Sequence, residues 1–423
     1  MNLDDWLAHQ QLQHPDAIAL GLDRVREVAR RLGLTRPAKR VITVAGTNGK
    51  GSTVAFIEAI ARAAGWNVGA YTSPHLLRYN ERIRIDGVDA NDEALVATFE
   101  RIESVRVAGD GDAIPLTYFE YGTLAALLLM EQQTLDLAIL EVGLGGRLDA
   151  VNIIDADVAV VTTVDLDHQN FLGNDRETIG LEKAGVIRSG KPVVLGERDP
   201  PASVLRHAYR IGAPAIRAGC DYLIDELADG WRWREPGYSI DLPNPVLAAP
   251  AQRANAAAAI AALRALAMDL PDVAIIEGVR TARLRARLQS ILRDGVEIVI
   301  DVGHNPQAAR ELARWLDAHP AKGRTFAVFS ALADKDLRGI VTPLADHVAR
   351  WWLCGLHDTP RGLDGEALAQ RLQAALVGSD VRVVRDVAAA LRSAMDAATA
   401  GDRVLVFGSF HTAADAMRVL DLH

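Results

Sequence analysis

The stretch Val41-Ile42-Thr43-Val44-Ala45-Gly46-Thr47-Asn48-Gly49-Lys50-Gly51-Ser52-Thr53 decides the fold of this chain. It begins with β-prone residues and continues into a glycine-rich turn, and apolar residues then recur at helical spacing. This order of strand, glycine-rich turn and helix is the context in which a loop binds phosphate. Glycines let backbone N–H groups approach phosphate oxygens, and a helix N-terminus adds partial positive charge. The stretch therefore predicts a nucleotide-phosphate site.

This loop differs from a standard Walker A motif. Val44 stands where that motif has its first glycine, and Gly51 separates Lys50 from the hydroxyls of Ser52 and Thr53. The structural alternative is an ordinary glycine-rich turn. We prefer a phosphate-binding loop, because a lysine that can reach the β- and γ-phosphates and hydroxyls that can reach magnesium follow the strand at the required place.

Composition and charge restrict the function classes. The chain has 423 residues, 49% hydrophobic and 24% charged, and this length suggests two or three domains. Its net charge of −9 argues against nucleic acid as a main partner. We see no signal peptide, and the apolar runs are too short to span a bilayer. Two distant cysteines suit a reducing compartment. We expect a cytoplasmic monomer with no nucleic-acid or membrane partner.

After the loop, strand and helix patterns alternate. Strands are predicted at 67–71, 82–85, 135–142, 158–164 and 192–195, and helices at 92–105, 117–133 and 176–187. The nearly continuous apolar strands are typical of a buried parallel sheet, and the alternation predicts a doubly wound fold. Residues 200–250 give weaker signals, where Trp231-Arg232-Trp233 and several prolines suggest edge strands and loops.

A second cycle of strands and helices starts near Val296, after helices predicted at 252–267 and 272–282. Its strands are predicted at 298–301, 325–330, 351–354, 381–384 and 403–407. We therefore predict an α/β protein with two domains. Residues 1–292 form a large P-loop-type parallel-sheet ATPase domain, and residues 293–423 form a smaller Rossmann-like α/β domain.

Polar residues follow four strands of the first domain: the Gly46–Ser52 loop, Ser73, Glu141 and His168. Parallel sheets bind ligands beyond the carboxyl ends of their strands, so these residues should meet at one edge. Serine, glutamate and phosphate oxygens suit magnesium, for which histidine is a less usual ligand. Singly, Ser73 could cap a turn, Glu141 could be a solvated strand end and His168 a loop histidine. Their coincidence favours a metal site.

Two further segments have both a functional and a structural interpretation. Lys183 is by default a solvated helix lysine, and nothing in the local sequence distinguishes it. Asp301-Val302-Gly303-His304-Asn305-Pro306 joins a strand to a helix in the second domain. Asp301 there suits a ribose hydroxyl or an ammonium group, and the alternative is a capped helix start.

The loop Gly46–Ser52 and the turn Asp301–Pro306 together resemble motifs of the ATP-dependent Mur ligase superfamily. Four further segments narrow the resemblance to the folylpolyglutamate synthase and dihydrofolate synthase family, over essentially the whole chain: Thr72–His75, Thr117–Glu120, Glu141–Asp149 and Glu182–Gly185. The family implies ATP-driven amide bond formation, in which a carboxylate of dihydropteroate or a reduced folate forms an acyl phosphate that the amino group of L-glutamate attacks. It also implies two magnesium ions and a monovalent cation, with ATP as co-substrate.

The resemblance also assigns residues. The nucleotide contacts would be Gly46, Thr47, Asn48, Gly49, Lys50, Gly51, Ser52, Thr53, Asn255, Arg287, Asp301 and His304. Ser73 and Glu141 match ligands of one magnesium, His168 matches a ligand of the second, and Lys183 matches a lysine carried as a carbamate. The pterin and glutamate contacts would be Leu20, Gly21, Thr117, Phe119, Asp149, Ala150 and Ser409. Lys50, His168 and Lys183 would be catalytic.

Two positions depart from the family pattern. Arg285-Ala286 replace Pro-Gly before Arg287, which leaves the choice between Arg285 and Arg287 open, and Gly303 stands where alanine is usual. A ligase of cell-wall precursors is the nearest rival, disfavoured by Thr117-Tyr118-Phe119-Glu120. A nucleotide-dependent switch or a kinase are rivals from other classes, and glutamate-dependent ADP release would separate them from a ligase.

Overall fold

The computed structural model describes residues 1–16, 18–108, 113–357, 359 and 361–422. This part of the chain forms two compact units. Unit 1 comprises residues 1–246 and 253–282, and unit 2 comprises residues 247–252 and 283–423. The boundary that we predicted after residue 292 lies inside strand β12, Gln289–Arg293, which pairs with β13, Val296–Ile300, and so belongs to the sheet of unit 2.

Unit 1 is built on a mixed sheet of eight strands in the order β4-β3-β2-β5-β1-β6-β7-β8. The strands from β2 to β8 in this order are parallel, and β3 and β4 add an antiparallel hairpin. The bounds are β1 Arg40–Ala45, β2 Val68–Tyr71, β3 Ile83–Ile85, β4 Val88–Asp89, β5 Leu137–Glu141, β6 Val158–Val161, β7 Val193–Leu195 and β8 Ala215–Arg217. The strand carrying the glycine-rich loop, β1, is central, so its carboxyl end has neighbours on both sides.

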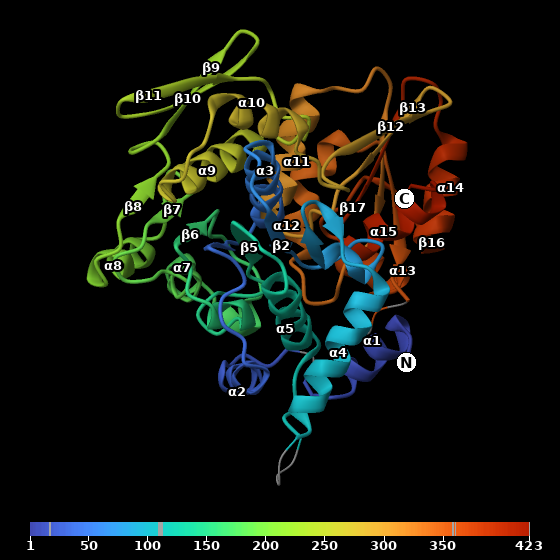
Figure 1. The fold of residues 1–423 in the computed structure, drawn as a ribbon. Helices are drawn as coiled ribbons and strands as arrows, with labels where there is room; N and C mark the ends of the chain where they lie inside the picture. Colours follow the sequence, from blue (N-terminus) through green and yellow to red (C-terminus); the bar gives the residue numbers. More distant parts are fainter. Residues whose placement is uncertain (17, 109–112, 358, 360, 423) are drawn as a thin grey trace. The chain divides into compact units, whose positions relative to one another are not determined.

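Helices cover both faces of this sheet (Figure 1). They are α1 Leu3–Gln11, α2 Asp23–Leu32, α3 Lys50–Ala63, α4 Asp92–Arg106, α5 Tyr118–Glu131, α6 Gln169–Leu172, α7 Arg176–Ala184, α8 Ala202–Arg210, α9 Gln252–Ala265 and α10 Asp272–Thr281, with short 3₁₀ turns η1 Tyr79–Arg82 and η2 Ala150–Ile153. Side chains alternate across a strand, so Val41 and Ala45 join the core under α4, α5 and α7, while Ile42 and Val44 are buried on the other face. That second face packs against α3.

Gly278 allows α10 to pack closely against α3. A Cβ at this position would lie 2.4 Å from the Cα of Ile60. Only glycine fits such an approach of two helix backbones. The helix that follows the glycine-rich loop is therefore held on its outer side as well as by the sheet.

The region from 200 to 250 differs from our prediction. Residues 202–210 form helix α8, which we did not predict, and residues 223–242 form an antiparallel sheet in the order β11-β10-β9. Its strands are β9 Leu223–Leu227, β10 Gly230–Glu235 and β11 Tyr238–Leu242. Trp231 and Trp233 lie in the central strand of this sheet, so their assignment to edge strands was wrong. Both indoles are buried, and their N–H groups donate to Pro243 O at 3.0 Å and Ala257 O at 3.2 Å.

Unit 2 contains a six-stranded sheet in the order β12-β13-β17-β14-β15-β16, parallel except for β12. Its remaining strands are β14 Thr325–Phe329, β15 Arg350–Gly355, β16 Asp380–Asp386 and β17 Arg403–Phe407. Its helices are α11 Pro306–Ala318, α12 Leu337–Val341, α13 Gly365–Leu372, α14 Val387–Ala397 and α15 Phe410–Val419, with the 3₁₀ turn η3 Thr342–His347. β13 and β17 are parallel neighbours, so the turns that follow them lie at the same edge of the sheet.

None of the helices in the described ranges combines the length and apolarity that crossing a bilayer needs.

Candidate active site

The glycine-rich loop joins the end of β1 to α3. Gly46 and Gly49 have φ values of +151° and +85°, which side chains rarely adopt. A Cβ at Gly49 would also lie 2.5 Å from Asn255 Oδ1, so the predicted nucleotide contact Asn255 lies against the loop. No side chain caps the N-terminus of α3, as far as the described residues show. The Lys50 ammonium bends back to the carbonyls of Gly46 and Thr47, at 3.0 and 3.2 Å.

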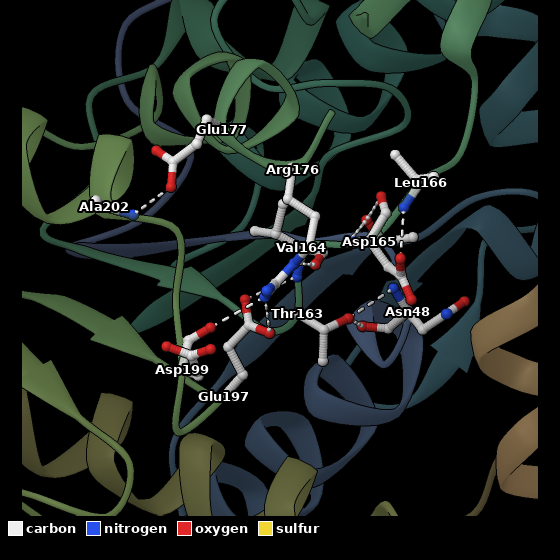
Figure 2. Close-up of polar contacts among 11 residues, drawn as sticks. Asn48, Thr163, Val164, Asp165, Leu166, Arg176, Glu177, Glu197, Asp199 and Ala202 are labelled. Carbon is white, nitrogen blue, oxygen red and sulfur yellow. Dashed lines mark hydrogen bonds and ion pairs between the residues drawn. The ribbon is translucent and has the colours of Figure 1, made fainter. Parts of the chain in front are cut away.

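The segment that follows β6 holds this loop in place. Asn48 N donates to Thr163 Oγ1 at 3.1 Å (Figure 2). Thr47 N donates to Thr163 O at 2.7 Å. Thr162 Oγ1 donates to Asn48 O at 2.6 Å. We had predicted a strand over 158–164, but β6 ends at Val161. Thr162 N still donates to Ala45 O of β1 at 2.9 Å, whereas Thr163 bonds to the loop. These two threonines are contacts that our sequence analysis missed, although a Thr-Thr pair at a strand end was visible.

Two hydroxyl residues begin α3 inside the protein. Ser52 and Thr53 are buried, with exposed fractions of 2% and 0%. Thr53 N donates to Gly49 O at 2.8 Å, and Thr53 Oγ1 has no hydrogen-bond partner among the described residues. A buried hydroxyl without a partner is costly, and a metal or phosphate ligand would satisfy it.

Ser73 and Glu141 meet at the carboxyl ends of β2 and β5. These strands are parallel neighbours, and Ser73 N donates to Glu141 Oε2 at 3.1 Å. Glu141 is buried, with 4% exposed. The hydroxyl and carboxylate are hard oxygen donors that fit magnesium. The described residues contain no group of three or more His, Cys, Asp or Glu side chains able to hold a metal. A metal at this edge therefore needs ligand oxygens from phosphate or from another source.

Lys183 is buried, so the solvated helix lysine that we considered is wrong. It lies in the last turn of α7 with 3% exposed. Burial lowers the pKa of Lys183 to about 7; the positive charge of Lys50 adds to this shift, and Asp167 opposes it. These electrostatic neighbours place Lys183 by the loop lysine and by the segment that carries His168. His168 itself has a left-handed backbone, with φ of +48°, at the start of α6.

A second group of side chains surrounds Asp149. Its buried carboxylate accepts hydrogen bonds from Leu144 N at 2.8 Å and Val151 N at 3.1 Å. Burial raises the pKa of Asp149 to about 7, although these amide bonds oppose the shift. A Cβ on Gly143 would lie 2.7 Å from the Phe119 ring and 3.3 Å from Asp149 Oδ2. The structure thus brings together Phe119 and Asp149, two of the residues that the family resemblance assigns to the pterin.

The start of α5 connects this group to the residues around Leu20. Thr117 caps α5 in a reciprocal box with Glu120, whose carboxylate accepts from Thr117 N at 2.7 Å. Arg24 reaches Glu120 Oε1 at 3.2 Å and Ala19 O at 2.8 Å. The predicted loop residues Leu20 and Gly21 are therefore tied to the same helix end, and Ala150 is buried at the first position of η2. Ala17, which precedes Leu20 and Gly21 in the chain, lies outside the described residues.

Unit 2 gathers its predicted site residues at the ends of β13 and β17. The buried Asp301 carboxylate accepts from Leu288 N at 2.9 Å and from Gly303 N at 2.7 Å. Burial raises the pKa of Asp301, and the Arg287 guanidinium opposes this shift. The Phe410 ring contacts both Arg287, at 5.8 Å, and His304, at 6.2 Å. Ser409 caps α15 by accepting from Thr412 N at 3.0 Å.

Comparisons with known proteins agree with this arrangement. Residues 44–221 match the Mur ligase middle domain, and residues 286–410 match the glutamate ligase domain of Mur ligases. The dihydrofolate synthase/folylpolyglutamate synthase of Escherichia coli is 45% identical over 99% of this chain and 96% of its own length. That of Haemophilus influenzae is 40% identical over 99% and 98%.

Solved structures of dihydrofolate synthase/folylpolyglutamate synthases are also similar to this chain. E. coli FolC in complex with DHPP and ADP has a TM-score of 0.93 and 45% identity, covering 100% of this chain and 98% of that one. A bifunctional folylpolyglutamate synthase/dihydrofolate synthase with Mn, AMPPNP and L-glutamate bound has a TM-score of 0.91 and 45% identity, with the same coverage.

Fold and site together define an ATP-dependent ligase of the Mur ligase class. The glycine-rich loop, the oxygen donors at the strand ends and the second α/β unit are its parts. Within that class, the chain belongs to the dihydrofolate synthase/folylpolyglutamate synthase family, whose members join L-glutamate to dihydropteroate and to folates through an acyl phosphate.

Proposed function

We propose the following roles for the described residues in the ligase reaction. Lys50 and the backbone of residues 46–53 hold the ATP phosphates, and Asn255 supports the loop from α9. Phe119 packs on the pterin ring while Asp149 accepts hydrogen bonds from its donor edge. Arg287, Asp301 and His304 are further nucleotide contacts, and Ser409 contacts L-glutamate. The folate substrates are dihydropteroate and reduced folates, and the protein acts as a cytoplasmic monomer.

The central chemical problem is repulsion between two anions. A substrate carboxylate must approach the γ-phosphate of ATP, and the products of this step are an acyl phosphate and ADP. Positive charge near the phosphates offsets the repulsion, and Lys50 supplies it at the loop. The glutamate amine then attacks the acyl carbon, and inorganic phosphate leaves with the electron pair of the broken C–O bond.

The donor set fits two divalent metals at this edge. Ser73 and Glu141 would hold one, and His168 and Lys183 would hold the other, with phosphate oxygens completing both. Bound magnesium would supply further positive charge to the phosphates. A monovalent cation would complete the set that the family resemblance implies.

The burial of Lys183 is the observation that carries the proposal. A cationic lysine beside Lys50 and a metal would be repelled. Because burial lowers its pKa to about 7, a large fraction of the amine is neutral at physiological pH. A neutral amine adds to carbon dioxide, forms an N–C bond and releases one proton, and the product is a carbamate. Its oxygens are suitable ligands for magnesium.

The decisive experiment replaces Lys183. We expect Lys183→Ala to fold and to lose nearly all glutamate-dependent ADP release, and acetate to restore part of it. Wild-type activity should also fall when dissolved carbon dioxide is removed, if the carbamate exchanges during the assay. Normal ligation by Lys183→Ala would reject the assignment. A failure of acetate to restore activity would not by itself reject the assignment, because an untethered acid binds weakly.

The class of reaction is tested on the wild type. ADP release is measured with dihydropteroate and with tetrahydrofolate, each with and without L-glutamate. We expect release to depend on glutamate for both substrates. Release without glutamate would indicate a nucleotide switch, and a stable phosphorylated product would indicate a kinase.

A further inference from the structure

The segment Thr163–His168 has no regular structure, yet its backbone near Val164 is buried. Val164 has 1% of its surface exposed, and residues 163–168 lie between β6 and α6. Buried backbone N–H and C=O groups require partners. At Val164 these partners are side chains and not the backbone of a neighbouring strand. The Val164 amide donates to Glu197 Oε1 at 3.0 Å, and Arg176 Nε donates to the Val164 carbonyl at 2.8 Å (Figure 2).

Arg176 and Glu197 bind the backbone of this segment just after the pairing of β6 with β7 ends. β6 and β7 pair in register up to Val161 and Leu195, and Gly196 N still donates to Val161 O at 2.8 Å. A Cβ on Gly196 would lie 2.8 Å from Thr162 O, so the chains approach closely there. One residue later the carboxylate of Glu197 replaces the backbone acceptor. Arg176 and Glu197 also bind each other, at 3.0 Å.

Arg176 connects the segment to the helix that carries Lys183. It is the first residue of α7, and Lys183 lies seven residues on, in the last turn of the same helix. Two helical turns separate the two residues, so they lie on the same side of α7. The guanidinium also donates to Asp199 O at 3.0 Å, and this fixes the chain after β7.

The opposite side of the segment is bound to the phosphate loop. Asp165 N donates to Thr47 Oγ1 at 3.0 Å, and Thr47 Oγ1 donates to Asp165 O at 3.0 Å. The segment is thus held between the loop on one side and the Arg176–Glu197 pair on the other. His168 follows Asp165 by three residues, so its position depends on both attachments.

We propose that Arg176 and Glu197 are positioning residues for the second metal of the ligase, because they fix the His168 segment against the Lys183 helix. The inference rests on the proposed assignment of His168 and Lys183 to that metal. We assign no substrate contact to either residue of the pair. Residues that orient metal ligands from behind typically change metal affinity or activity by about 10- to 100-fold when they are replaced.

Glu177 provides a matched control for Glu197. It is the neighbour of Arg176 on α7, and its carboxylate accepts from Ala202 N at 2.9 Å (Figure 2). It also accepts from Ser203 N at 2.6 Å. It also pairs with an arginine, Arg206, at 3.3 Å. These contacts hold α8 and do not involve the His168 segment. Glu177→Ala therefore removes the same kind of interaction from the same helix end.

The test measures Mn²⁺ binding by electron paramagnetic resonance in the full-length protein with AMPPNP. We expect Glu197→Ala to weaken one of two Mn²⁺ sites about tenfold or more, and Glu197→Gln to weaken it less, because the amide oxygen still accepts from Val164 N. Hydrogen exchange at Val164 should accelerate in Glu197→Ala. The KM for dihydropteroate at saturating metal should stay within about twofold, since the pair is not assigned to the pterin site. Glu177→Ala should keep both Mn²⁺ affinities.

Three results would overturn the proposal: unchanged Mn²⁺ affinity in a folded Glu197→Ala protein, equal weakening in Glu177→Ala, or a parallel loss of metal and pterin binding. If Glu197→Ala does not fold, Arg176→Lys decides, since a lysine keeps the charge but cannot make all three guanidinium contacts. A wild type that binds one Mn²⁺ would refute the metal assignment itself. A wild type with two sites and unaffected variants would refute only the role of the pair.

Discussion

Two turns in this molecule have the same order of strand, glycine-containing turn and helix, but they satisfy their polar groups differently. In unit 1, α3 follows Gly49 with no side-chain cap within the described chain, and its first turn contains a buried hydroxyl without a partner. In unit 2, α11 begins at Pro306 with Asn305 as its cap, and Asp301 accepts two backbone amides. The first turn is built to be completed by a ligand, whereas the second is largely complete by itself.

This difference explains why a turn motif alone does not identify a function. Both sequences fit a ligand site and both fit a capped helix start. What distinguishes them is which hydrogen-bond groups the rest of the fold satisfies. An uncapped helix N-terminus attracts anions, while a capped one has less to offer them.

The largest effect should come from removing the charge of the first turn. Lys50→Ala should lower glutamate-dependent ADP release on the order of 10²-fold or more, because the developing phosphoryl charge loses a positioned cation. Lys39→Ala is the control, since Lys39 pairs with Asp136 on the surface at the opposite end of β1. Near-normal turnover in a folded Lys50→Ala protein would remove the functional distinction between the turns.

The glycines of the two turns should also differ. Gly49→Ala places a Cβ 2.5 Å from Asn255 Oδ1 at a φ of +85°, so the loop must move, and we expect kcat/KM for ATP to fall roughly 10- to 100-fold. Gly303→Ala brings a Cβ to 2.8 Å from the side-chain atom Asp301 Oδ1 without a left-handed backbone. Its cost should stay within about 1 kcal/mol in thermal unfolding. Equal decreases of kcat/KM for ATP in Gly49→Ala and Gly303→Ala would contradict the difference between the two turns.

The buried carboxyl group of Asp149 predicts how activity depends on pH. The pKa of Asp149 is raised to about 7, so its carboxylate is protonated as pH falls through 7 and loses an acceptor for the pterin. We expect kcat/KM for dihydropteroate to fall roughly tenfold for each pH unit below that value. Asp149→Asn should have a low kcat/KM that no longer depends on this ionisation. The same decline in Asp149→Asn would assign the titration to another group.

The smallest effect should come from the cap of the second turn. Asn305→Ala removes the acceptor for Ala308 N and should lower the free energy of unfolding by about 1 kcal/mol, measured by denaturant titration. L-glutamate KM should not change. Ser409→Ala also removes a helix cap, but at a proposed glutamate contact, so it should raise that KM as well. If both variants changed only stability, Ser409 would be a cap and nothing more.

Much of the fold was predictable because its signals are local. The strand at 403–407 and the helix starts at 92, 176, 252, 272 and 306 agree with the sequence patterns, since hydrophobic periodicity and helix caps act over a few residues. The strand predicted at 82–85 agrees as well, since β3 spans Ile83–Ile85. The end of β6 and helix α8 were not predicted. In the first case, contacts with the glycine-rich loop, which precedes the segment by more than one hundred residues, decide where the strand stops.

By itself, the sequence determined the phosphate loop, the alternation of strands and helices and, through its resemblance to a family, the ligase chemistry. Only the tertiary structure decided which polar residues are buried together. Lys183 is unremarkable in sequence, and its lowered pKa results from burial and from Lys50, which is distant in the chain. Arg176 and Glu197 show no motif either, and they meet at Val164 because β6 and β7 are neighbours. Desolvation and charge proximity depend on distance in space, and a linear pattern does not contain that distance.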